Sequence, residues 1–219
     1  MIRYVLIFSL LCGIPAAAEG RKQLFNGKNM DGWKFVPRTE GDIGFSISEG
    51  MIQTGGAKGM LLYAGDKIGN ATLRVVYKMS NPKGNSGVFI RIPMIPDSET
   101  FAIHHGIEVQ IDDQDDDWHC TGTLYSMTKA MARASKPAPE WNTMEITLDG
   151  LRTIVHVNGA LVTDYDGVGA VPERTKQFEP ERGPRPEIGY IALQNHDPTA
   201  IVTFKEISLE PLKVKKPKK

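Results

Sequence analysis

The chain has 219 residues, of which 41% are hydrophobic and 24% are charged, and 26 basic residues balance 26 acidic ones. This length suffices for one domain with a real core, and the apolar content excludes a wholly disordered chain. Two cysteines exclude a disulfide-dense scaffold, and a neutral chain lacks the basic excess typical of nucleic-acid-binding proteins. We therefore expect no nucleic-acid partner.

Residues 1–18 have the pattern of a secretory signal peptide. Arg3 precedes an apolar run, and Ala16 and Ala18 supply the small residues of a cleavage site. The run is shorter than the roughly 20 apolar residues that a bilayer span needs. A buried N-terminal helix is the alternative interpretation. We expect an exported protein, periplasmic or secreted, without stable insertion in a membrane.

Period-two alternation of apolar and polar residues dominates the chain from residue 71 onward and predicts strands. Two dipeptides that tolerate positive φ, Asp149-Gly150 and Asn158-Gly159, predict tight hairpin turns. The second lies between two alternating segments, which we expect to pair. The predicted strands are 71–79, 87–92, 106–112, 144–148, 153–157, 160–165, 189–194 and 201–209.

One helix is predicted, over Ser126–Lys136, where two prolines follow directly. Many short strands with connections rich in glycine and proline favour an all-β sandwich or jelly roll. We assign a single domain to residues 19–212. The lysine-rich tail, 213–219, is predicted to be disordered, and its five lysines offset an acidic excess in the domain.

Alternation separates core residues from surface residues on three of the predicted strands. On each, the larger apolar side chains are assigned to the core, so that the others project from the opposite face. If the strands are neighbours, acid, amide, guanidinium and imidazole groups share one surface that suits a polyhydroxylated ligand. An ordinary solvated sheet face is the alternative. The side chains assigned to this surface are Phe89, Arg91, Glu108, Gln110, Asp112, Gln194 and His196.

The most acidic stretch follows the strand at 106–112. It reads DDQDDDWH over 112–119, and six carboxylates fall between positions 108 and 117. Such oxygens suit calcium, and an imidazole suits a transition metal. The spacing is not that of an EF-hand, and a solvated acidic loop is the alternative. A divalent metal is therefore a candidate cofactor, with Glu108, Asp112 and His119 as candidate ligands and the metal's identity open.

Short catalytic motifs are otherwise scarce. The P-loop, G-x-G-x-x-G, G-x-S-x-G and H-E-x-x-H patterns do not occur, which argues against nucleotide-binding, serine-hydrolase and zincin functions. Cys120 is a lone thiol without a family signature, and we expect it to be a packing residue.

Seven segments follow one another over about residues 23–212: LFNGKNMDGW (24–33), NSGVFIR (85–91), GIEVQIDD (106–113), TGTLYSM (121–127), PAPEWNTMEITLDG (137–150), VNGALVTDY (157–165) and GYIALQNHD (189–197). Together they resemble the 3-keto-disaccharide hydrolase family, also called the 3-keto-glucoside 1,2-lyase/hydratase family. The resemblance implies a concanavalin-like jelly roll of two antiparallel sheets, found in exported bacterial proteins of carbohydrate metabolism. The sequence departs from the family at Asn195, where an acid is expected, and at Asp197, where glycine is common.

The resemblance also implies a reaction on a 3-keto-glycoside, in which C2 is deprotonated, the C1 substituent is eliminated and water is added. A sugar substrate and an upstream sugar 3-oxidoreductase are the partners that this chemistry implies. Such a reaction needs a base, an electrophile for the oxyanion and an acid for the leaving oxygen. We assign Glu108 as base or metal ligand, and Arg91 or a cation to the enediolate. Proton transfers fall to His119, Tyr125 or His196, and substrate binding to Gln110, Gln194, Phe89 and Asp112.

Two other functions use the same surface. A lectin-like module would bind a sugar without cleaving it, because jelly rolls often host binding alone. A conventional glycoside hydrolase would need two carboxylates about 5–9 Å apart. Glu108 and Asp112 lie about 13 Å apart by the rise of a strand, so this hypothesis ranks last.

Overall fold

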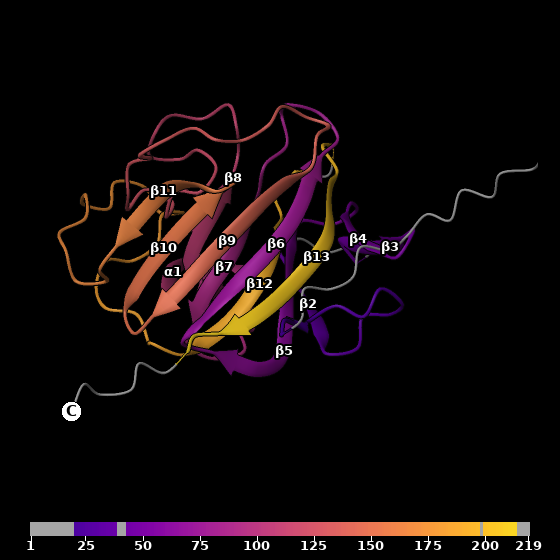
Figure 1. The fold of residues 1–219 in the computed structure, drawn as a ribbon, viewed down its shortest axis with the longest axis horizontal. Coiled ribbons are helices and arrows are strands. Elements are labelled where there is room, and N and C mark those ends of the chain that lie inside the picture. Colours follow the sequence, from indigo (N-terminus) through magenta and orange to yellow (C-terminus); the bar gives the residue numbers. More distant parts are fainter. Residues whose placement is uncertain (1–19, 39–42, 198, 214–219) are drawn as a thin grey trace, which may run out of the picture.

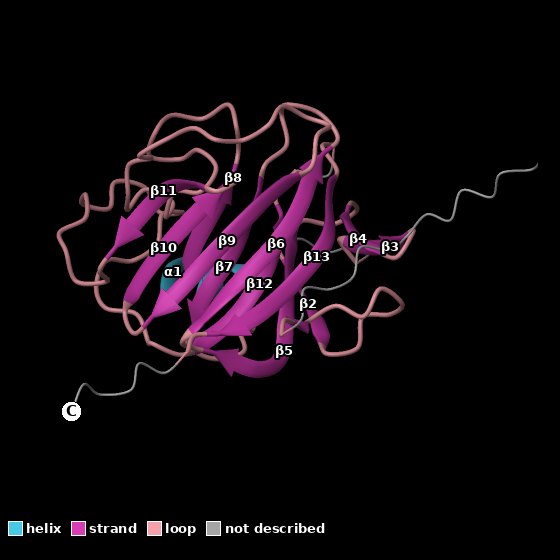
Figure 2. Cartoon of the chain, viewed as in Figure 1, coloured by secondary structure: helices cyan, strands magenta, loops and turns pink. Residues whose placement is uncertain are grey.

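The computed structural model describes residues 20–38, 43–197 and 199–213. The predicted signal peptide (1–18) and nearly all of the predicted basic tail lie outside these residues. Two antiparallel sheets stack face to face, with long loops at one end (Figures 1 and 2). None of the helices in the described ranges has the length and apolar character to cross a membrane.

Thirteen strands and one helix make up the described part of the chain. One sheet has eight strands in the order β11-β10-β9-β6-β13-β4-β3, with β1 also paired to β13, and the other has five in the order β2-β5-β12-β7-β8. The elements are β1 (Lys22–Gln23), β2 (Trp33–Pro37), β3 (Phe45–Ser48), β4 (Met51–Thr54), β5 (Gly59–Ile68), β6 (Ala71–Met79), β7 (Ser86–Ile92), α1 (Glu99–His105), β8 (Ile107–Ile111), β9 (Asn142–Asp149), β10 (Arg152–Val157), β11 (Ala160–Tyr165), β12 (Gly189–Asn195) and β13 (Val202–Pro211).

The strands predicted from alternation are confirmed, with ends that differ by at most two residues. The hairpin at Asn158-Gly159 pairs β10 with β11, and Asp149-Gly150 joins β9 to β10. The five strands before residue 71 were not predicted from alternation. The central strand β5 shows why: its residues 59–62 are all buried, so the alternation of a half-buried strand is missing there.

The helix predicted over Ser126–Lys136 is wrong. The backbone amides of Ala130 and Met131 donate to the distant carbonyls of Asp117 and Val162. These amides therefore bond to other parts of the chain and not to the preceding turn of a helix. The helix forms at α1 instead, where the Ser98 side chain accepts from the amide of Phe101 at 3.3 Å. A side-chain cap of this kind satisfies an otherwise unpaired amide in the first turn.

Two apolar clusters organise the molecule. The larger fills the space between the sheets, where alternating apolar side chains of both inner faces meet. The smaller lies on the outer face of the five-stranded sheet, where α1 covers Phe89 of β7 and Ala192 of β12. Cys120 is free and buried, as predicted for a packing residue. The rest of the outer face beyond α1 is available for a site.

Candidate functional site

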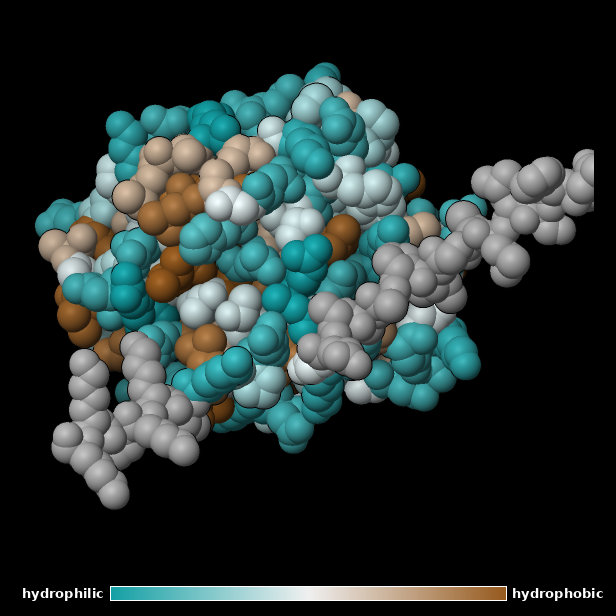
Figure 3. Space-filling view, in the orientation of Figure 1, coloured by the Kyte–Doolittle hydropathy of each residue, from teal (hydrophilic) through white to brown (hydrophobic). Residues whose placement is uncertain are grey.

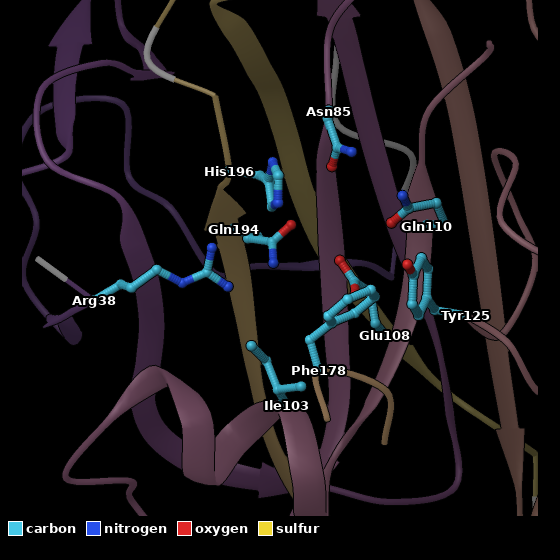
Figure 4. Close-up of a pocket in the computed structure, with 9 residues that line it drawn as sticks. All are labelled: Arg38, Asn85, Ile103, Glu108, Gln110, Tyr125, Phe178, Gln194 and His196. Atoms are coloured by element: carbon cyan, nitrogen blue, oxygen red, sulfur yellow. The ribbon is translucent and has the colours of Figure 1, made fainter. Parts of the chain in front are cut away.

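A cavity of about 450 Å³ opens on the outer face of the five-stranded sheet, beside α1. Its volume falls in the range of small-molecule sites. Polar side chains of β8 and β12, of Asn85 just before β7 and of His196 just after β12 project into it (Figure 4). The prediction that these strands are neighbours is confirmed. The lining residues are Arg38, Asn85, Ile103, Glu108, Gln110, Tyr125, Phe178, Gln194 and His196.

The floor of the cavity depends on the register of β7 against β8. Phe89 lies opposite Glu108, and Gly87 lies opposite Gln110, so all four positions share one face. A β-carbon at Gly87 would approach Glu108 Oε1 to 2.3 Å. Because glycine has no side chain, the Glu108 carboxyl group can lie across β7 and reach the cavity.

Glu108 is the most strongly perturbed acid that lines the cavity. Burial, and to a lesser degree the nearby charge of Glu99, raises the pKa of its carboxyl to about 8, while Arg38 opposes the shift. When the Gln110 amide is turned so that its nitrogen faces acceptors, it donates to Glu108 Oε1 at 3.1 Å and to the Ser86 carbonyl at 3.2 Å. A half-buried carboxyl with a pKa near neutrality suits proton transfer.

An ion pair beneath the cavity was not predicted from the sequence. Arg38 Nε lies 2.5 Å from Glu99 Oε2, and the Glu99 carboxyl is buried. Gln194 Nε2 donates to Glu99 Oε1 at 3.5 Å. Burial raises the pKa of Glu99 although Arg38 lowers it. The nearby sequence offers only one feature that could have pointed to Glu99, its position after Ser98 at the start of a short helix. Its pairing with Arg38 depends on the tertiary structure.

Tyr125 and His196 both line the cavity, as their predicted roles require. The Tyr125 amide donates to the Glu108 carbonyl at 3.0 Å, which fixes the ring beside that strand. Burial, and then the charge of Glu108, raises the pKa of Tyr125 to about 12, so its hydroxyl stays protonated. Burial together with the charges of Arg38 and Lys58 lowers the pKa of His196, which favours a neutral imidazole.

Arg91 does not reach the cavity, so its predicted place in the site is wrong. Its φ is +57° and the pairing of β7 with β12 shifts register nearby, so Ile92 packs with Phe89 in its stead. The buried guanidinium turns towards the other sheet and donates to the carbonyls of Gly150 and Arg152 at 2.9 and 3.0 Å. An irregularity of this kind reverses which face a side chain occupies.

Two predicted substrate contacts are also placed elsewhere. Phe89 has the predicted face but is fully buried beneath α1, so it supports the floor without contacting a ligand. Asp112 lies just past the end of β8 and accepts from Asn85 Nδ2 at 3.1 Å. Its partner Asn85 lines the cavity and Asp112 does not. By contrast, Gln110 and Gln194 line it as predicted.

The three candidate metal ligands do not converge. Glu108 faces the cavity, while His119 belongs to a group with Asp115 and Asp116 whose ligand atoms all lie within 4.8 Å of one another. His119 Nδ1 is 2.7 Å from Asp116 Oδ1. Two carboxylates and an imidazole are a donor set that a transition metal accepts. The imidazole of this group packs against the ring of Tyr125, with centroids 4.7 Å apart.

Asn195, the residue where the family resemblance implies an acid, lies outside the cavity lining. Its side-chain nitrogen donates to the carbonyls of Gly44, Gly55 and Ala57 at 2.9–3.2 Å. A carboxylate could not donate to three carbonyl oxygens. The departure therefore stabilises the loops around β3 and β4 and leaves the polar lining unchanged.

Comparisons with known proteins agree with this architecture. Residues 20–210 match the model of the 3-keto-alpha-glucoside-1,2-lyase-like domain. A "3-keto-disaccharide hydrolase" of Bacteroides thetaiotaomicron is 27% identical over 167 residues, which are 65% of this chain and 57% of that protein. The chain thus spans little more than half of that relative.

Solved structures share the fold. A candidate glycosyl hydrolase from Parabacteroides distasonis has a TM-score of 0.69 at 23% identity, over 88% of this chain and 99% of its own. A Bacillus subtilis protein described with a galectin-like fold has a TM-score of 0.61 at 11% identity, over 87% and 94%. The predicted all-β, concanavalin-like sandwich of two antiparallel sheets is confirmed. Because the family model covers nearly all of the described residues, this chain belongs to the 3-keto-alpha-glucoside-1,2-lyase-like domain family.

Proposed function

We propose that this chain cleaves the glycosidic bond of 3-keto-glycosides by removing the C2 proton, eliminating the C1 substituent and adding water. The observation that carries the proposal is Glu108, a carboxyl with a pKa of about 8 in a polar cavity of a family member. A carbonyl at C3 acidifies the C2 proton, so a carboxylate made more basic by burial can act as the base.

The neighbouring side chains supply the other two requirements of this reaction. As the C2 proton leaves, negative charge develops on the oxygen at C3, and the guanidinium of Arg38 and the amide of Gln194 are donors that stabilise it. The protonated hydroxyl of Tyr125 donates to the leaving oxygen at C1. Water then adds at C1 of the unsaturated sugar and gives a proton back to the Tyr125 oxygen, while the proton held by Glu108 returns to C2, so that hydrolysis is the net result.

If the protein binds a divalent metal, we propose that Asp115, Asp116 and His119 hold it. Bound there, it would supply a positive charge behind the Tyr125 ring, because His119 packs against that ring. The ion would replace the present contact between His119 and Asp116. We also propose that the protein is exported and that a sugar 3-oxidoreductase supplies its substrate, since the reaction starts from an oxidised sugar.

A second candidate, ordinary hydrolysis of unoxidised glycosides by two carboxyl groups, has one observation in its favour. The charges of Glu99 and Glu108 interact closely enough to raise the pKa of Glu108. However, Glu99 is buried, paired with Arg38 and absent from the cavity lining. A carboxyl without access to the substrate cannot serve as nucleophile or acid.

One assay separates these functions. Purified protein is incubated with a 3-keto-glucoside and with its unoxidised parent, with and without added divalent metal, and the products are identified by mass spectrometry. We expect cleavage of the keto substrate alone, with exchange of the C2 proton for deuterium in heavy water. Cleavage of the parent sugar would support the paired-carboxyl function. A rise in Tm with ligand but no product would support a binding module.

A further inference from the structure

Phe178 is an exposed aromatic residue at the edge of the cavity. It lines the cavity, and 53% of its surface is exposed. Leaving a phenyl ring in water forfeits the stabilisation that burial would give. An aromatic ring beside carboxyl and amide groups matches the two sides of a sugar, whose ring faces present C–H groups and whose edge carries hydroxyls.

The backbone on both sides of Phe178 is held in place. The Gln177 carbonyl lies 2.8 Å from His104 Nε2, which connects the loop to α1. The buried Glu179 carboxylate accepts from the hydroxyl of Thr175 at 2.9 Å and from Arg182 Nη2 at 3.1 Å. Because both neighbours are anchored, the ring is presented to the cavity by a fixed loop.

Glu108 lies between two groups of side chains that line the cavity. Arg38, Gln194 and His196 lie on one side of Glu108 and Tyr125 lies on the other, while the Phe178 ring overlaps Glu108 in this view, with Tyr125 next to it (Figure 4). The hydroxyl-rich keto sugar suits the first side, where donors and acceptors converge. The bond that breaks lies next to the base, so the departing group extends towards Phe178.

We propose that Phe178 stacks on the ring of the leaving group and thereby selects glycosides whose leaving group is itself a ring, such as a second sugar. This inference rests on the proposed function, since it assigns one side of the same cavity. Phe178 is then a specificity-determining contact that takes no part in proton transfer. Its effect falls on substrate affinity and depends on what is attached at C1.

The test compares two substrates with the same keto sugar and anomeric configuration: a 3-keto-disaccharide and the corresponding methyl 3-keto-glycoside. Both leaving groups depart as alcohols, and any difference in their intrinsic reactivity cancels because each substrate is compared between wild type and variant. For Phe178→Ala we expect kcat/KM to fall about tenfold on the disaccharide, mainly through KM, and by less than about twofold on the methyl glycoside. Phe178→Trp should restore the preference. An equal loss on both substrates, or no loss on either, would overturn the proposal.

Val168→Ala is the matched control, because Val168 is another exposed apolar residue of the same loop and lines a different cavity. It should leave both substrates unaffected. Calorimetric affinities for the two compounds keep the tests separate. If the wild-type protein cleaves neither compound, the proposed function fails, while the ratio of affinities in wild type and Phe178→Ala still decides the role of Phe178. A ratio that does not change between the two proteins would contradict it.

Discussion

On the two outer faces of this sandwich, Glu145 and Glu108 have opposite surroundings. On the eight-stranded sheet, seen in Figure 3, Arg74 lies 3.3 Å from Glu145 and 3.5 Å from Glu206, and Arg21 also contacts Glu145. On the five-stranded sheet, the Glu108 carboxyl has no arginine or lysine within ion-pair distance among the described residues. The buried Gln194 Oε1 likewise has no hydrogen-bond partner there.

The difference distinguishes a carboxylate that is paired within the protein from a carboxyl group that is available to a ligand. Half-exposed ion pairs contribute little to the free energy of unfolding, and both charges already have a partner within the protein. Buried polar groups without partners are costly, and a fold retains them where a ligand or a reaction completes them. The contrast therefore predicts that equivalent substitutions on the two faces have unequal effects on activity and stability. The following experiments test that difference.

The largest effect is expected for Glu108→Gln. Removing the base should lower kcat by about 10²–10⁴-fold without weakening the fold, because the amide is nearly isosteric and carries no charge to bury. Glu145→Gln on the opposite face is the matched control and should leave kcat unchanged. Steady-state kinetics on a 3-keto-glucoside measures both. Full turnover by Glu108→Gln would remove this residue from the mechanism.

Arg91→Ala tests the assignment of that arginine to structure. It removes a buried guanidinium that donates to two carbonyls of the other sheet, and we expect the free energy of unfolding to fall by about 3 kcal/mol. Urea denaturation measures this loss. At a temperature where the variant is folded, its kcat/KM should be that of wild type. A specific loss of kcat with unchanged stability would instead return Arg91 to the site.

Gly87→Ala should cost activity more than stability. The added β-carbon would lie 2.3 Å from Glu108 Oε1, and the end of that side chain can move away. A shift of about 1 Å in a reacting group lowers the rate by roughly 10²-fold. Kinetics together with a melting curve separate the two effects. A variant with normal kcat would show that Glu108 tolerates displacement from the floor of the cavity.

The pH dependence gives the smallest effect per step and tests the protonation state. Since burial raises the pKa of Glu108 to about 8, the base is mostly protonated at neutral pH. We expect kcat/KM to rise about tenfold per pH unit up to about pH 8 and then level off. A profile that falls over this range would identify Glu108 as an acid.

Stability should change in the opposite direction. The folded protein binds the Glu108 proton more tightly than the unfolded chain does. The contribution of this group to the free energy of unfolding is therefore fully present below the ordinary pKa of 4.5, and it is lost as the pH rises towards about 8. In Glu108→Gln this part of the pH dependence of Tm should disappear. If the Tm profiles of the two proteins coincide, the carboxyl titrates near its ordinary value.

The sequence was sufficient to predict the strands after residue 71 and their hairpins. It also predicted the sheet face on which Glu108, Gln110 and Gln194 lie. These features follow from alternation along single strands, which needs no knowledge of the partner strand. The resemblance of ordered segments to a family added the sandwich and the carbohydrate chemistry. Neither source could place residues whose surroundings come from distant parts of the chain.

Three features of the site depend on contacts between distant parts of the chain. The backbone irregularity at Arg91 reversed its face, and α1 covered Phe89. Arg38 met Glu99 from a different element, and this pair modulates the charge around Glu108. Local pattern fixes which way a side chain points within a regular strand. Which side chains then meet, and how much water they keep, depends on long-range packing, and that packing sets the pKa values on which the chemistry depends.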